Sequence, residues 1–113
     1  MTIVEHIISI RTEVMKEIGP HRAVELLQKL SALIGMATDE WIEAEMSYNI
    51  VFKSLSIKHE KISEARVNAK ASNEYKKKLI TEAQIESINK LIDSLKYLIK
   101  IKTNEMEKSR YQT

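Results

Sequence analysis

The sequence of 113 residues contains no cysteine, which excludes disulfide bonds, thiol catalysis and cysteine-ligated zinc. Glycine and proline are also scarce, with 2 Gly and 1 Pro, and neither occurs after Gly35. Because a β-sandwich or barrel needs turn residues about every ten positions, this scarcity argues against both folds. No apolar run approaches the roughly 18 residues that a membrane span requires, and the N-terminal residues lack the pattern of a secretory signal.

The residues that are present indicate one helical domain with a packed core. Hydrophobic residues make up 43% of the chain and charged residues 30%, so intrinsic disorder is not expected. The charges are unevenly distributed: residues 1–60 hold 6 basic and 9 acidic side chains, and residues 61–113 hold 12 and 7. The basic second half favours an anionic partner.

Apolar spacing and turn signals predict two short helices at the N-terminus. Residues 2–18 carry apolar side chains at intervals of three and four, as one face of a helix does. Proline is tolerated in the first turn of a helix, so Pro20 predicts the start of the second helix. Gly35 predicts the end of that helix. We therefore expect residues 1–36 to form a short helical hairpin.

A third helix is expected to begin at Thr38, a residue type that caps helix N-termini. The helical pattern weakens over residues 56–61 and returns over 63–71, either as a continuation or after a kink. The main apolar face of this third helix carries Trp41, Ala44, Tyr48, Phe52 and Leu55. Ser72 is a second capping signal, and it opens the longest predicted helix, which ends near Arg110. Residues 37–113 are thus expected to form a long helical hairpin within a single domain.

The last predicted helix has a coiled-coil-like pattern. Its heptad seam consists of Ile85, Ile88, Ile92, Leu95, Ile99 and Met106. Two leucines of a neighbouring row widen the stripe, and a wide stripe favours a helical bundle over a two-stranded coil. At 1.5 Å per residue, the helix is too long for the two N-terminal helices to cover. We expect the uncovered remainder to mediate self-association.

No pattern in the sequence predicts catalysis. His59 and Glu60 begin like a zinc-protease helix, but Ser63 stands where the second histidine is needed. Two pairs of glutamates one turn apart lack the further ligands of a di-iron bundle, and no glycine-rich phosphate loop is present. We therefore expect no catalytic residue, no metal site and no cofactor, and we do not expect an enzyme.

Basic residues gather where the third and last predicted helices meet. The candidate nucleic-acid-binding residues are Lys58, Lys61, Arg66, Lys70, Tyr75, Lys76, Lys77 and Lys78. Lysine and arginine can follow a phosphate backbone while a base stacks on an aromatic ring. The alternative is an ordinary solvated helix face, with Tyr75 as a core anchor instead of a stacking platform.

The order of these features resembles small helical proteins of tailed bacteriophages and prophages that lie among DNA replication and recombination genes. In layout it is similar to the UvsY-type recombination mediators. The resemblance covers roughly residues 39–112. It is carried by Asp39-Glu40-Trp41, Tyr48, Ser63-Glu64-Ala65-Arg66, Ala69-Lys70-Ala71-Ser72, Tyr75, Ile92-Asp93-Ser94-Leu95-Lys96-Tyr97, Glu105-Met106 and Ser109-Arg110.

The resemblance implies a protein of the bacterial cytoplasm that binds single-stranded DNA and helps to load a recombinase. It also implies a homo-oligomer formed through the helical C-terminal part. The DNA-facing residues would then be Lys58, Lys61, Arg66 and Lys70. The oligomer interface would be Ile88, Ile92, Leu95 and Ile99.

Two other functions fit the same composition. A small phage inhibitor of a host defence protein, similar to an anti-CRISPR, could use an acidic run to mimic nucleic-acid phosphates. That run consists of Asp39, Glu40, Glu43 and Glu45. A structural coiled-coil component of a virion or scaffold would assemble without affinity for nucleic acid.

Overall fold

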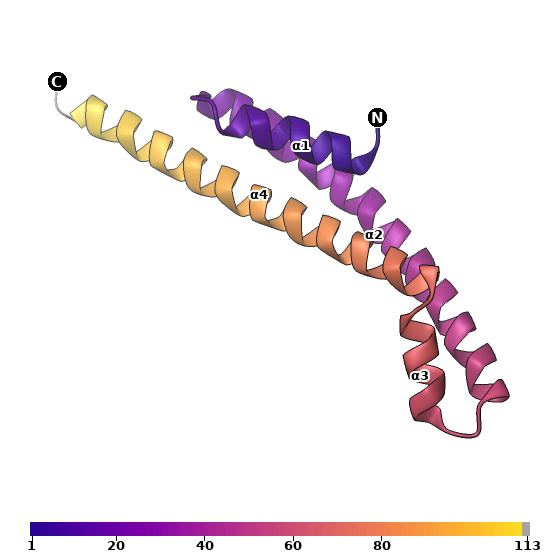
Figure 1. Ribbon diagram of the computed structural model, residues 1–113. Helices are drawn as coiled ribbons and strands as arrows, with labels where there is room; N and C mark the ends of the chain where they lie inside the picture. The colour runs from indigo at the N-terminus through magenta and orange to yellow at the C-terminus, as the bar shows by residue number, and fades with distance from the viewer. Residues whose placement is uncertain (112–113) are drawn as a thin grey trace. The chain divides into compact units, whose positions relative to one another are not determined.

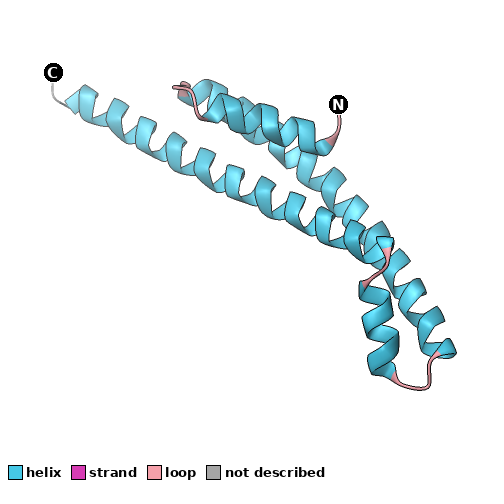
Figure 2. Ribbon diagram, in the orientation of Figure 1, coloured by secondary structure: helices cyan, strands magenta, loops and turns pink. Residues whose placement is uncertain are grey.

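The computed structural model describes the backbone of residues 1–111 and the side chains of residues 1–105. Four helices make up this part of the chain: α1 (Ile3–Val14), α2 (Pro20–Lys58), α3 (Ile62–Lys70) and α4 (Asn73–Tyr111) (Figure 1). No strand occurs among the described residues, and short loops or turns join the helices (Figure 2). The predicted all-α class and the long C-terminal helix are confirmed. The Met106 side chain of the predicted seam lies outside the described residues.

Local capping signals account for most helix starts. Thr2 Oγ1 accepts a hydrogen bond from the Glu5 amide at 3.2 Å, and α1 begins at the next residue after Thr2. Pro20 is the first residue of α2, as predicted. Ser72 Oγ accepts a hydrogen bond from the Tyr75 amide at 3.2 Å, which confirms the predicted cap of α4. Helix α3 is separate from α2, so the pattern that weakens before residue 62 marks a true break.

Helix α1 ends at Val14, four residues before its predicted end. The next three residues are exposed, so continuing the helix would bury little additional surface. The residue before a proline is also disfavoured in helical conformation, which keeps the chain open before Pro20.

The predicted helix end at Gly35 and the predicted N-cap at Thr38 are both wrong, because α2 passes through these positions without a break. Helix α2 therefore has 39 residues, the same number as α4. Gly35 does not adopt a positive φ, the conformation in which glycine ends a helix. Buried residues stand on both sides of it, with Leu33 before and Ala37 after. Their burial outweighs a glycine penalty of about 1 kcal/mol.

Replacement of Gly35 by alanine is expected to raise the free energy of unfolding by about 1 kcal/mol, because alanine favours helix and restricts the unfolded chain. A Cβ atom at this position meets no atom within 4 Å, so no steric cost opposes the gain. Urea denaturation followed by circular dichroism measures the change. Gly19→Ala is the control: its Cβ is equally unhindered, but the Gly19 carbonyl accepts from the Ala23 amide at the N-cap of α2, where alanine is less favourable than glycine, so we expect no gain. Destabilisation by Gly35→Ala would contradict the prediction.

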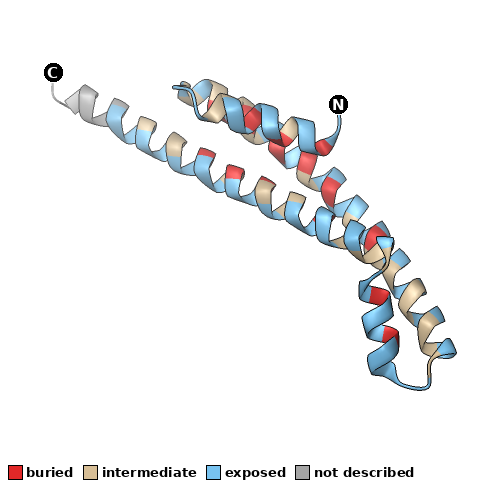
Figure 3. Ribbon diagram, viewed as in Figure 1, coloured by how far each residue is buried: buried red, intermediate tan, exposed pale blue. Residues whose placement is uncertain are grey.

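Residue contacts divide the chain into two compact units. Unit 1 comprises Met1–Gly35 and α4 from Glu86 onward, and unit 2 comprises Met36–Ile85. Large aliphatic side chains from three helices are buried in unit 1, and Figure 3 marks the buried positions in red (Figure 3). They are Ile3, Ile7 and Ile10 of α1, Leu26, Leu30 and Leu33 of α2, and Ile88, Leu91 and Leu95 of α4.

Unit 2 has a core of a different kind. Its buried residues are Ala37, Ala44, Ala65, Ala69 and Thr81, and no large side chain is buried among the described residues of this unit. The aromatic residues Trp41, Tyr48 and Phe52 are only half-buried. Small side chains allow helices to approach closely, but they remove little apolar surface from water. Burial therefore stabilises unit 2 less than unit 1.

Candidate nucleic-acid interface

All eight candidate nucleic-acid-binding residues belong to unit 2 and lie within residues 58–78, which we call the basic segment. Lys58 is the last residue of α2, and Lys61 directly precedes α3. Six of the seven basic side chains are exposed: Lys58, Lys61, Arg66, Lys70, Lys76 and Lys77. Lys78 and Tyr75 are half-buried. The structure thus gathers most of the predicted cations at the accessible surface of one unit.

Helix α3 presents Arg66 and Lys70 because its alanines face inward. Ala65 and Ala69 are both 0% exposed and lie one turn apart, so they define the packed face of the helix. Arg66 and Lys70 each follow one of these alanines and are also one turn apart. They therefore share a face that lies beside the packed one.

The six exposed basic side chains have no ion-pair partner among the described residues. The basic segment holds seven basic and three acidic residues. One of its acids, Glu64, lies 3.7 Å from Nδ1 of His59, and Nε2 of the same ring lies 3.2 Å from Nδ2 of Asn68. These contacts join the loop residue that follows α2 to α3. Glu64 is thus paired with His59, and it forms no ion pair with any of the six exposed cations.

Tyr75 and Lys78 take part in packing against Tyr48 of α2. The centroids of the Tyr48 and Tyr75 rings are 5.3 Å apart, and Lys78 Nζ lies 5.0 Å from the Tyr48 ring centroid. A cation over a tyrosine face contributes about 0.5–1 kcal/mol at an exposed site. Of the two interpretations left open for Tyr75, the observed ring contact favours the core anchor. Contacts with phosphate would fall mainly to the other six residues.

The same unit also contains the acidic run of α2. Asp39, Glu40 and Glu43 are exposed, while Glu45 is half-buried. Trp41 lies within this run, and its Nε1–H donates to Glu82 Oε1 at 3.2 Å, which joins α2 to α4 inside unit 2. The unit as a whole carries eight acidic and eight basic residues. The acidic residues of unit 2 are thus concentrated near the start of its sequence and the basic residues in the basic segment, and the two signs balance in number.

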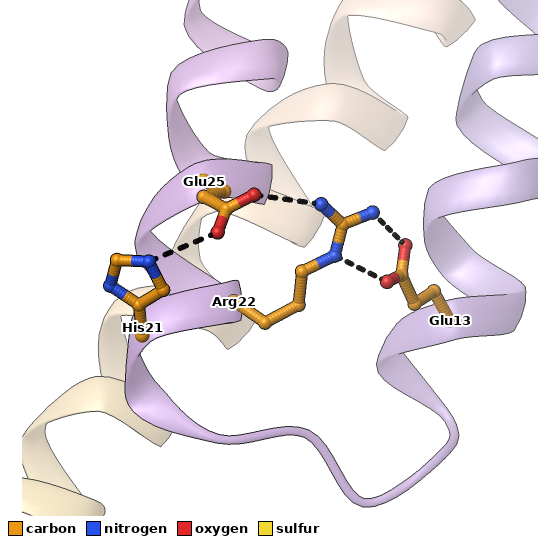
Figure 4. Close-up of polar contacts among 4 residues, drawn as sticks. All are labelled: Glu13, His21, Arg22 and Glu25. Atoms are coloured by element: carbon orange, nitrogen blue, oxygen red, sulfur yellow. Dashed lines mark hydrogen bonds and ion pairs between the residues drawn. The ribbon is translucent and has the colours of Figure 1, made fainter.

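A second polar cluster, in unit 1, was not predicted from the sequence. The Arg22 guanidinium donates to both carboxylate oxygens of Glu13 and, through Nη1, to Glu25 Oε2 at 3.0 Å (Figure 4). His21 Nε2 lies 3.2 Å from the other Glu25 oxygen. The spacing of Arg22 and Glu25 signals an intrahelical pair, but Glu13 meets Arg22 only because the chain turns between α1 and α2.

The hydrogen bond from Arg22 lowers the pKa of the Glu13 carboxyl below its ordinary value. The same bond, followed by that to Glu25, raises the pKa of the Arg22 guanidinium. Both groups are held in their charged forms, and neither is kept free to exchange a proton near neutral pH. The cluster therefore fits the role of joining α1 to α2.

The residues predicted to form an oligomer interface lie in unit 1. Ile88 and Leu95 are both 0% exposed, while Ile92 and Ile99 are half-buried. The first two side chains already pack inside a single copy of the chain. They have no exposed surface to offer to another copy without a rearrangement of unit 1.

Among the described residues, no group of three or more histidine, cysteine or carboxylate side chains is arranged to hold a metal ion. None of the helices in this part of the chain combines the length and apolar character needed to cross a membrane.

Comparison with protein-family models, with curated proteins and with solved structures found no match to this chain. The resemblance to UvsY-type mediators therefore depends on sequence pattern alone. The geometry of the basic segment is an independent observation, and it is the one from which a function can be argued.

Proposed function

We propose that the protein binds single-stranded DNA non-specifically and serves as an accessory of phage recombination or replication. The observation that carries the proposal is the set of six exposed basic side chains in the basic segment, none of them ion-paired within the described residues. A cluster of unpaired cations in sequence attracts phosphates and releases the counterions condensed on a nucleic acid. The preference for single strands and the role in recombination come from the resemblance.

Phosphate contacts would supply most of the binding energy. Tyr75 is engaged with Tyr48, so stacking on that ring contributes little unless the ring leaves its packed position. Binding without stacking or base-edge contacts has little sequence preference and depends strongly on salt. The exposed acids Asp39, Glu40 and Glu43 would repel the strand and confine it to the basic segment. Because each copy offers few cations, several copies on one strand would bind far better than one.

Titration of the protein into a labelled single-stranded oligonucleotide, followed by fluorescence anisotropy, tests the proposal. Contact with about five phosphates implies a salt slope near −3.5, hence roughly a hundredfold loss of affinity between about 50 and 200 mM salt. The variant Arg66→Glu/Lys70→Glu is expected to weaken binding by at least about tenfold and to flatten the salt slope by about 1.4, because two contacts are lost.

The matched control is Lys96→Glu/Lys100→Glu. These lysines are also exposed and one turn apart, but they lie on α4 in unit 1. The control changes the net charge by the same amount and should retain most of the affinity. Absence of binding at low salt would refute the proposal. Equal losses from the two variants would show that net charge, and no particular site, governs the interaction.

A further inference from the structure

Helix α2 has a second apolar face within unit 2, which was not recognised in the sequence. It consists of Ile42, Met46, Ile50 and Ile57, and we call it the α2 stripe. Their exposed fractions are 44%, 60%, 69% and 80%. The spacings of four, four and seven residues place all of them on one side of the helix.

The α2 stripe lies opposite the packed face of the same helix. Ala37, Ala44, Tyr48 and Leu55 mark the packed face, since they are buried or half-buried. At 3.6 residues per turn, the centre of the stripe is about 170° around the helix from the centre of that face. A helix that is apolar on opposite sides is normally covered on both. One side of α2 is therefore covered within unit 2, and the other is accessible.

The charges along α2 indicate what covers the stripe. Toward its N-terminal end stand Asp39, Glu43 and Glu45, and toward its C-terminal end stand Lys53 and Lys58. A parallel helix of the same sequence would bring like charges together. An antiparallel copy would bring the acidic end of each helix beside the basic end of the other. The stripe is thus self-complementary in charge, which is the requirement for a two-fold symmetric interface.

We propose that two copies of this chain associate through the α2 stripe, with the helices antiparallel and the two-fold axis close to Asn49. In this register Ile42 lies near Ile57 of the partner subunit, so the ends of the stripe cover one another. Glu45 lies near Lys53 of the partner subunit, and Asp39 lies near Lys58 of the partner subunit. The inference goes beyond the proposed DNA binding, because it rests on the α2 stripe, shares only Lys58 with the basic segment and requires no nucleic acid.

Sedimentation equilibrium of the full chain without DNA tests the interface. The wild-type protein is expected to be a dimer in the micromolar range. Met46→Glu/Ile50→Glu places charges in the centre of the apolar contact and is expected to weaken association by more than about a hundredfold. The matched control is Val4→Glu/Ile8→Glu, an equally spaced pair on α1 with exposed fractions of 45% and 54%. The control should remain dimeric.

A charge-reversal series tests the antiparallel register without disturbing the apolar contact. Lys53→Glu is expected to weaken the dimer by about tenfold, because it meets the acidic end of the partner helix. Adding Glu43→Lys/Glu45→Lys to the same chain restores opposite charges and should recover the lost affinity. Far-UV circular dichroism verifies that every variant stays helical.

A monomeric wild-type protein would overturn the inference, whatever its affinity for DNA. Persistence of the dimer in Met46→Glu/Ile50→Glu, or equal dissociation of the α1 control, would also overturn it. Failure of the triple charge reversal to recover association would exclude the antiparallel arrangement.

Discussion

Truncation of Leu95 to alanine is expected to lower the free energy of unfolding by about 2.7–5 kcal/mol, the range for leucines removed from well-packed cores. Leu95 is 0% exposed in unit 1, where large aliphatic residues from three helices are buried. The loss combines the transfer free energy of the removed atoms with the cost of the cavity that remains. Urea denaturation followed by circular dichroism measures it.

Leu79→Ala is the matched control, with the same chemical change on the same helix. Leu79 is 45% exposed and lies in unit 2, so its truncation should cost less than about 1 kcal/mol. Similar losses from the two substitutions would contradict the assignment of Leu95 to the core. A large loss from Leu95→Ala alone would support the conclusion that this heptad position stabilises the single chain.

Enlargement of Ala69 to leucine is expected to destabilise unit 2 by about 1–3 kcal/mol. Ala69 is 0% exposed on α3, and the other buried side chains of this unit, Ala37, Ala44, Ala65 and Thr81, are also small. A leucine has no space there unless α3 moves away. The effect should appear first in hydrogen exchange, as amides of α3 that exchange roughly 5–150 times faster, since 1.4 kcal/mol corresponds to tenfold.

Amides in the buried part of α1 provide the internal reference for this experiment and should keep their exchange rates. Ala83→Leu is the external control, because Ala83 is exposed on α4 in the same unit. We expect it to leave the exchange of α3 almost unchanged. Normal protection of α3 in Ala69→Leu would contradict the prediction, because it would mean that a leucine fits at this buried position without displacing the helix.

The sequence predicted those features of the fold that depend on local chemistry. Apolar spacing gave the helical class, and the start of α2 at Pro20 and the cap of α4 at Ser72 were predicted from single residues. The helix end predicted at Gly35 and the cap predicted at Thr38 were wrong. Both residues are local signals inside a helix in which Leu33 and Ala37 are buried. Burial is a property of the folded chain, and here it outweighs a propensity cost of about 1 kcal/mol.

The sequence shows which basic residues make up the candidate site, but it does not show which of their side chains are exposed in the folded chain. The cluster of cations could be seen in the sequence, but the contact of Tyr75 and Lys78 with Tyr48 joins residues far apart in the chain. The α2 stripe was not predicted from the sequence, because Ile42 and Met46 alternate along the chain with the residues of the packed face. Two apolar faces on one helix give a weaker periodic signal than one.

The position of the single tryptophan gives the chain an intrinsic optical label. Trp41 lies in unit 2, and its indole N–H donates to Glu82 at 3.2 Å within that unit. Indole emission depends on local polarity and hydrogen bonding, so the fluorescence spectrum reports the state of unit 2. Unit 1 contains no tryptophan and therefore contributes no tryptophan emission, although its helices contribute to the far-ultraviolet circular dichroism. Unit 2 can therefore be followed by fluorescence and compared with the helical signal of the whole chain in the unmodified protein, without any attached dye.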